Sequence, residues 1–233
     1  MMHWGEHEGG AERLQRLPGS VPAQVEVWRL ALDPTAPLAA ADWALLSDGE
    51  RARVGRLRRH EDRLRAVATR AALRRRLAVR LDAEPRGLRL VINRHGKPRL
   101  PDPAGLAFNV SHAGDFALIA LSTQGEVGID IERRLASTDE QALAALVLSP
   151  RERRPDMTAR LGFHERWVAK EAVLKALGLG IGDHLQALSV LPGGGVGEAR
   201  YRLQHARADW PRLEAWALAA PAGYAAALAL SHH

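Results

Sequence analysis

Apolar and polar residues alternate along several short stretches of the chain, and this alternation predicts β-strands. In the first part of the chain the stretches are 24–32, 88–93, 106–112 and 116–122. Residues 60–81 have helical spacing instead, with Leu64, Val67, Ala68, Ala71, Ala72 and Leu77 on one apolar stripe. Two shorter helices are expected before this one, over 37–47 and 47–60, the second capped by Ser47 or Asp48.

The second part of the chain repeats this order of elements. A strand is predicted over 127–132, followed by helical segments from about residue 138 through "LSPRER" (148–153) to "ERWVAKEAVLKALG" (165–178). Four further strands are predicted, over 185–191, 199–204, 213–219 and 224–231.

Three pairs of similar segments occur in the same order in the two parts. "LSDGER" (46–51) resembles "LSPRER" (148–153), "ATRAALRRRL" (68–77) resembles "AKEAVLKAL" (169–177), and "GDFALIALS" (114–122) resembles "GYAAALALS" (223–231). Chance repetition of common patterns is the alternative, but the shared order favours an internal duplication. We therefore predict an α+β pseudo-dimer of two similar halves, 1–123 and 124–233, joined by a turn at 122–127, with the active site in the cleft between them.

Composition narrows the class of protein. Hydrophobic residues make up 46% of the chain, so a packed core is expected. There is no cysteine, which excludes disulfides and thiolate metal sites and fits a cytoplasmic protein. No apolar run reaches the length of about 18 residues that a membrane span needs, and residues 1–20 have the composition of a loosely ordered leader rather than a signal peptide.

Charge is distributed unevenly. Residues 51–99 contain 17 Arg or Lys against 4 Asp or Glu, within a formal net charge of +6. This asymmetry indicates that one part of the molecule meets an anionic partner. The alternative is that many of these arginines lie on solvated helix faces.

Asp130 and Glu132 stand one residue apart in the strand predicted over 127–132, so both carboxylates project from one face. Two neighbouring carboxylates repel, and each raises the pKa of the other unless a positive charge lies between them. A hard divalent cation such as Mg²⁺ favours these oxygen ligands. The alternative is a strand end whose acids pair with neighbouring arginines or a helix.

The helix predicted over 165–178 carries Glu171 and Lys175 four residues apart, with Trp167 four residues before Glu171. Glu171 and Lys175 share a face, and Trp167 lies on that face or beside it. A surface Glu–Lys pair is a common feature that contributes only about 0.3–0.5 kcal/mol. If the helix packs against the strand of Asp130, however, Glu171 becomes a third oxygen ligand and Lys175 a phosphate contact.

The first half offers Lys97 at the tip of the turn "HGKP", and Ser111 and His112 at the end of the strand "FNVSH". His112 is a candidate general base, a hydrogen-bond donor to a phosphate or a structural histidine, and the residues alone favour the last. The basic segment adds Arg53 and Arg65.

Four motifs follow one another along the chain: "GKP" (96–98), "FNVSH" (108–112), "VGIDIE" (127–132) and "WVAKEAVLK" (167–175). In kind, order and spacing they resemble the 4'-phosphopantetheinyl transferases of the Sfp type, the surfactin-synthetase-activating class. The resemblance covers residues 45–231, and the "KEA" ending is similar to the W/KEA branch. Val168 departs from the family pattern, where a small polar residue or Cys is usual, and implies only a packing change.

The resemblance implies that the 4'-phosphopantetheine arm of coenzyme A is transferred to a serine of an acyl or peptidyl carrier protein, with release of 3',5'-ADP. It implies that Asp130, Glu132 and Glu171 hold Mg²⁺ against the pyrophosphate. Glu171, Lys175 and Asp130 would be the catalytic residues, with Glu171 as the base for the serine, directly or through water, and Lys175 on the pyrophosphate. The implied contacts to the rest of coenzyme A are Lys97 and Pro98 at the adenine, and Ser111, His112, Arg65 and Arg53 at the 3'-phosphate.

Two other functions are weighed against this one. A metal-dependent nuclease also uses an acid pair followed by Glu and Lys, but usually with the last two residues two apart on a strand. A basic nucleic-acid-binding module would need no metal. We expect no nucleic-acid or membrane partner, and a monomer, because the duplication already pairs two halves in one chain.

Overall fold

The structure is a computed structural model, and it describes residues 14–18, 21–101, 105–134, 137–158, 160–180, 184–193 and 199–232. The predicted mixture of helices and strands in two sheet-containing halves is confirmed. Each half has its own antiparallel sheet and its own long helix.

The first half contains a four-stranded sheet in the order β1-β2-β6-β5. Its strands are β1 (Leu14–Arg16), β2 (Val25–Ala31), β5 (Ala107–Ala113) and β6 (Phe116–Ser122). The helices are α1 (Ala40–Leu45), α2 (Asp48–Gly55), α3 (His60–Leu81) and the short 3₁₀ turn η2 (Pro85–Gly87). A separate hairpin is made of β3 (Val91–Ile92) and β4 (Pro98–Arg99).

The second half contains a five-stranded sheet in the order β7-β11-β10-β9-β8. Its strands are β7 (Glu126–Arg133), β8 (Leu188–Leu191), β9 (Arg200–His205), β10 (Arg212–Ala217) and β11 (Tyr224–His232). The helices are α4 (Ser137–Val147), α5 (Pro155–Thr158), α6 (Phe163–Ala176) and the 3₁₀ turn η3 (Leu185–Ala187).

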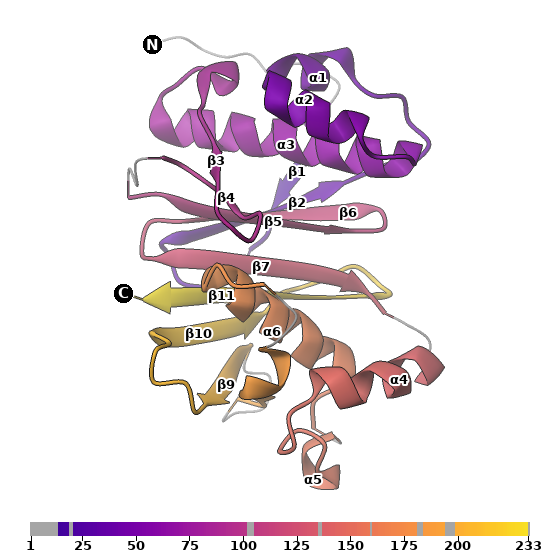
Figure 1. Ribbon diagram of the computed structural model, residues 1–233, viewed down its shortest axis with the longest axis vertical. Helices are drawn as coiled ribbons and strands as arrows, with labels where there is room; N and C mark the ends of the chain where they lie inside the picture. Colours follow the sequence, from indigo (N-terminus) through magenta and orange to yellow (C-terminus); the bar gives the residue numbers. More distant parts are fainter. Residues whose placement is uncertain are drawn as a thin grey trace.

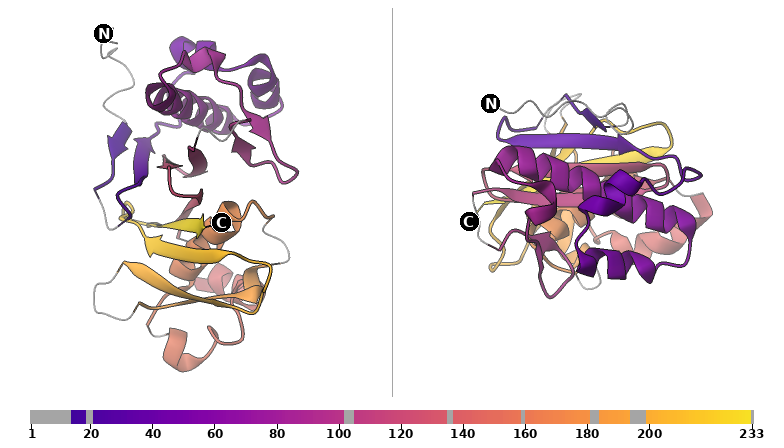
Figure 2. Two further views of the ribbon diagram at one scale, coloured as in Figure 1. Left: turned by 90° about the vertical axis from the view of Figure 1, so that its left-hand side faces the viewer. Right: turned by 90° about the horizontal axis from the view of Figure 1, so that it is seen from above.

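The two halves lie one above the other, and the two sheets lie between α3 and α6 (Figures 1 and 2). Alternating residues of β2 and β6 pack against alternating residues of β7 and β11 in one apolar cluster, which includes Val27, Ile129 and Ile131. The opposite face of the first sheet packs on α3, and that of the second sheet packs on α6. Side chains at even positions of β7 therefore face α6, as the alternation of "VGIDIE" predicts.

The long helix α3 has the bounds that the apolar stripe predicts. Leu64, Val67, Ala71 and Leu77 are buried on that stripe, whereas Ala68 is half-buried. Its neighbour α2 begins with Ser47 as N-cap in a reciprocal arrangement, in which the Ser47 backbone N–H donates to the Glu50 carboxylate and the Glu50 N–H donates to the Ser47 hydroxyl. The cap is thus Ser47 and not Asp48.

The segment "LSPRER", expected to be helical, is a turn between α4 and α5, so this prediction is wrong. Ser149 and Glu152 nevertheless make the same reciprocal pair of hydrogen bonds as Ser47 and Glu50. The helix does not continue because Glu152 is drawn into the core, where it is fully buried and bonds the Val190 N–H and the Lys170 ammonium. Tertiary contacts override the local helical signal here.

In the first half the equivalent glutamate has an equivalent role. Glu50 pairs with Arg70 at 3.4 Å and with Arg74 at 2.8 Å, both on α3. In each half a Ser-x-x-Glu turn is therefore fixed by cations from the long helix that follows it. This shared arrangement supports the duplication.

Two other segments differ from expectation. The strand predicted over 88–93 is reduced to Val91 and Ile92, which pair only with β4. Within the predicted leader, Leu14–Arg16 forms β1 and pairs with β2, while residues 1–13, 19 and 20 lie outside the described residues. In the described part of the chain, no helix combines the length and apolar character that crossing a membrane requires.

Candidate active site

The halves meet where β5 of the first sheet runs beside β7, an edge strand of the second. An edge strand leaves backbone N–H groups unpaired on one side. Here the Ile129 N–H donates to the Asn109 side-chain oxygen at 2.9 Å, and the Ile131 N–H donates to the Ser111 hydroxyl at 3.4 Å. The residues on both sides of Asp130 are thus held by side chains from the other half.

Asp130, Glu132 and Glu171 are brought together at this seam. One carboxylate oxygen from each residue lies within 4.8 Å of the others. Asp130 is fully buried, Glu171 is 6% exposed and Glu132 is half-buried. Two residues come from β7 and one from α6, so the packing of helix on strand creates the cluster.

Lys175 and Trp167 complete the cluster from α6. The Lys175 ammonium lies 2.5 Å from Asp130 Oδ1 and 3.8 Å from Glu171 Oε2. It also donates to the Ser111 hydroxyl at 3.2 Å. The Trp167 indole N–H donates to Glu171 Oε1. The Lys175 ammonium thus lies against two of the three carboxylates.

Burial and the neighbouring negative charges raise the pKa values of two of the acids. Desolvation, followed by the charges of Asp130 and Glu171, raises the pKa of Glu132 to about 7. The pKa of Glu171 is also raised, by desolvation first and by Asp130 second, while Lys175 and the indole hydrogen bond oppose the shift. Acids held in this way favour a cation that would neutralise them.

The donor set fits a hard divalent cation. Asp130 Oδ2 is buried, and no partner for it exists among the described residues. A buried carboxylate oxygen of this kind costs free energy unless a donor or a cation reaches it. Mg²⁺ takes oxygen ligands and is usually held by a small number of carboxylates together with water and phosphate oxygens, which this cluster can supply in part.

Gly128 positions the cluster, and the sequence pattern alone did not single it out. A Cβ atom at this position would lie 1.9 Å from the Ala172 carbonyl oxygen and 2.4 Å from the Ala176 backbone nitrogen. The backbone of α6 therefore approaches β7 so closely that only glycine fits. A glycine inside a strand pattern is the signal that could have pointed to this contact.

His112 and Arg65 lie beside the cluster on the first half. Arg65 donates to the Gly114 carbonyl at 3.3 Å and pairs with Asp62 at 2.9 Å. His112 keeps an exposed face, yet desolvation and then the charge of Arg65 lower its pKa. Ser111 differs from both, because its hydroxyl is buried and bonded to Asp130 at 2.8 Å.

The remaining predicted residues are farther from the carboxylates. The Lys97 ammonium pairs with Glu126 at 2.7 Å and donates to the Val127 carbonyl at 3.1 Å, at the start of β7. Pro98 begins β4. Arg53 lies on α2 with an exposed side chain.

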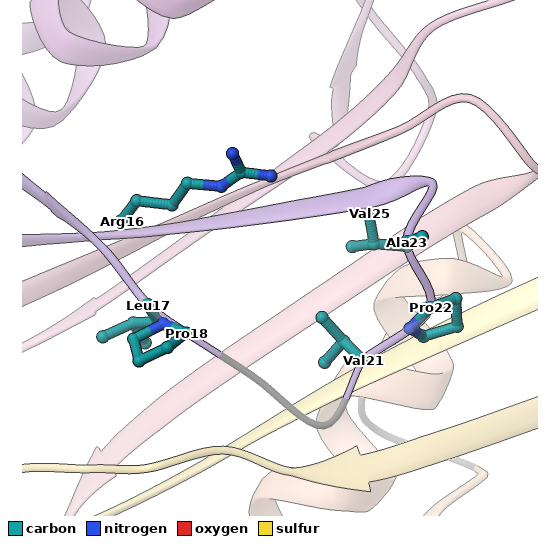
Figure 3. Close-up of a pocket in the computed structure, with 7 residues that line it drawn as sticks. All are labelled: Arg16, Leu17, Pro18, Val21, Pro22, Ala23 and Val25. Carbon is teal, nitrogen blue, oxygen red and sulfur yellow. The ribbon is translucent and has the colours of Figure 1, made fainter.

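A cavity of about 340 Å³ lies elsewhere, at the connection between β1 and β2 (Figure 3). Its described lining residues are apolar except Arg16. None of the predicted site residues lines it, so we assign it no part in the chemistry.

Comparison with known proteins identifies the class. Residues 126–229 match the 4'-phosphopantetheinyl transferase superfamily, and residues 32–124 match the N-terminal region described for 4'-phosphopantetheinyl transferases. The match to the superfamily contains the carboxylate cluster and Lys175.

Individual relatives agree with this class. A Synechocystis sp. protein that carries the family's name is 36% identical over 186 residues, which is 76% of this chain and 74% of the relative. The 4'-phosphopantetheinyl transferase HetI of Nostoc sp. is 36% identical over 68% of this chain and 70% of its own. A 4'-phosphopantetheinyl transferase of Bacillus subtilis is 28% identical over 66% of this chain and 71% of its own. The chain belongs to the 4'-phosphopantetheinyl transferase superfamily.

Proposed function

We propose that this 4'-phosphopantetheinyl transferase is a Mg²⁺-dependent enzyme of the Sfp type, in the W/KEA branch. It moves the 4'-phosphopantetheine arm of coenzyme A to a serine of an acyl or peptidyl carrier protein and releases 3',5'-ADP. The observation that carries the proposal is the convergence of Asp130, Glu132 and Glu171, with the Lys175 ammonium beside Asp130 and Glu171. The metal's contribution is to neutralise charge on the pyrophosphate that is cleaved.

Each residue of the cluster has a separate role in the transfer reaction. In the reaction a bond forms between the serine oxygen and the β-phosphorus, and the bond from that phosphorus to the ADP oxygen breaks. Phosphoryl transfer depends on positioning and charge neutralisation more than on covalent catalysis. Lys175 supplies a positive charge next to the leaving oxygen, and Glu171 accepts the serine proton, directly or through a water. Asp130 and Glu132 keep the cluster anionic enough to hold the cation.

Coenzyme A binding is assigned to residues of the first half. Arg65 and His112 bind the 3'-phosphate, with Arg53 farther out on α2. Desolvation and Arg65 lower the pKa of His112 in the free protein, and a bound phosphate would oppose that shift while the ring donates a hydrogen bond to it. Lys97 and Pro98 contact the adenine. Ser111 contributes mainly by holding Asp130 and β7, as its buried hydroxyl supports.

The proposal is tested by incubating the protein with coenzyme A, Mg²⁺ and an apo carrier protein and weighing the carrier by mass spectrometry. We expect the mass of one phosphopantetheine to be added, and a chelator to stop the reaction. Asp130→Asn, which keeps the side-chain shape, should abolish transfer and leave the melting temperature close to that of the wild type. The matched control is Asp48→Ala, whose side chain is 97% exposed. Unmodified fatty-acid, polyketide and peptide carriers would refute the proposal.

The same cluster suggests a nuclease as the second candidate. Glu171 and Lys175 lie on a helix four residues apart, which disfavours that reaction. The nuclease is tested with single- and double-stranded DNA and RNA in Mg²⁺, where we expect neither cleavage nor salt-sensitive binding. We also propose that the unit of function is a monomer whose halves are 1–123 and 124–233.

A further inference from the structure

A stripe of side chains runs along α6 at intervals of four residues. Phe163, Trp167, Glu171 and Lys175 follow one another on one face of the helix. Phe163 contacts Trp167 edge to face, Trp167 donates to Glu171, and Lys175 joins Glu171 to Asp130. The acid is thus held in the middle of a continuous series of contacts.

The two oxygens of Glu171 have different partners. Oε1 accepts from the Trp167 indole, and Oε2 faces the Lys175 ammonium at 3.8 Å. An indole is a donor only, so this hydrogen bond requires the oxygen and not a proton on it. Rotation of the carboxylate would break the bond to Oε1. The structure therefore holds Glu171 in one orientation.

The indole itself cannot easily turn away. Phe163 packs against it with ring centroids 5.3 Å apart, and His164 stacks nearly parallel to it at 6.4 Å. His164 is 2% exposed and its Nδ1 lies 2.7 Å from Glu140 of α4, so this second ring is also fixed. The Trp167 ring is therefore packed between Phe163 and His164 and also bonded to the Glu171 carboxylate.

We propose that Trp167 is a specificity-determining residue that restricts Glu171 to one oxygen toward the bound cation and thereby favours Mg²⁺ over Ca²⁺. The inference rests on the proposed function, since it assumes a cation at this cluster. Mg²⁺ demands a compact octahedral shell, whereas Ca²⁺ takes more oxygens and readily accepts a carboxylate in bidentate fashion. Bidentate binding needs both oxygens of Glu171, and the indole holds one of them.

The test measures binding, not turnover. Dissociation constants for Mg²⁺ and Ca²⁺ are obtained from the displacement of Mn²⁺, followed by electron paramagnetic resonance, with the full chain in the presence and absence of coenzyme A. Trp167→Phe keeps an aromatic ring but removes the N–H. We expect it to lower the ratio of the Ca²⁺ dissociation constant to the Mg²⁺ dissociation constant by about tenfold, which is the scale of one hydrogen bond to a charged group. Trp167→His, which keeps a donor, should restore part of the ratio.

Phe163→Leu is the matched control, because it loosens the aromatic packing but leaves the indole N–H. It should change both affinities together and keep the ratio within about twofold of the wild-type value. If Trp167→Phe does not fold, benzothienylalanine at position 167 removes only the N–H and is expected to lower the ratio to the same extent. An unchanged ratio in a variant that binds Mn²⁺ overturns the role of Trp167 alone. Failure of the wild-type chain to bind Mn²⁺ overturns this role and the metal site together.

Discussion

Gly128 allows the most direct test of how the candidate active site is built. Replacing it with alanine adds one methyl group in the gap between β7 and α6. The nearest atom, the Ala172 carbonyl oxygen, would lie 1.9 Å from the new Cβ, and such contacts are essentially never shorter than 3.0 Å. The backbones of α6 and β7 must therefore separate by at least the difference, about 1.1 Å.

This displacement has two measurable effects. Overpacking of a well-packed site costs about 1–3 kcal/mol, and a contact with rigid backbone belongs at the upper end of that range. We therefore expect the free energy of unfolding to fall by about 2–3 kcal/mol and the melting temperature by about 4–12 °C. Ala172 is the neighbour of Glu171, so the same shift moves Glu171 from the β7 carboxylates. A misplacement of about 1 Å can cost about 100-fold in rate.

The assay is transfer of phosphopantetheine to a carrier at saturating Mg²⁺, together with a thermal melt of the same preparation. Gly49→Ala is the control, because a Cβ atom at position 49 would have no atom within 4 Å and the residue also lies in a regular element, α2. It should retain full activity and gain up to about 1 kcal/mol. Wild-type activity and melting temperature in Gly128→Ala would refute the account of the close approach.

Three further predictions concern charge. Because the pKa of Glu132 rises from 4.5 to about 7 on folding, its stabilising contribution in metal-free protein is complete below pH 4.5 and is lost as the pH rises through 7. Denaturant unfolding in chelator should therefore show a free energy of unfolding that falls with pH over this range, and Glu132→Gln should reduce that fall. Arg65→Gln or His112→Asn should raise the KM for coenzyme A more than that for dephospho-coenzyme A, and equal increases would remove the 3'-phosphate assignment. Lys170→Met leaves the Glu152 carboxylate buried without its ammonium and should cost about 3–5 kcal/mol in urea unfolding, with part of the loss recovered by adding Glu152→Gln.

Periodicity predicts the elements whose own residues decide them. The apolar stripe of α3 is long, and the alternation in β7 places Ile129 and Ile131 in the core, so both follow from local pattern. The turn at Ser149 does not, because the partner of Glu152 is Lys170, distant along the chain. The segment forms a turn because Glu152 bonds to groups that only the tertiary fold brings near it.

The same distinction applies to the candidate site. Spacing indicates that Asp130 and Glu132 share a face and that Glu171 and Lys175 share another, while the resemblance implies that the two faces meet. Neither indicates that Asn109 holds the edge of β7. That role depends on which strand of the first half lies beside β7, and a single sequence contains no such pairing information.

The predicted repeat places different side chains at matching positions of the two long helices. By the repeat, Arg70 and Arg74 of α3 correspond to Glu171 and Lys175 of α6. Both arginines pair with Glu50, so the first half has a cation, Arg70, at the position where the second half has the acid Glu171. Arg70→Glu alone would place a second carboxylate against the half-buried Glu50, so a single substitution that gives the first half this acid carries an electrostatic cost.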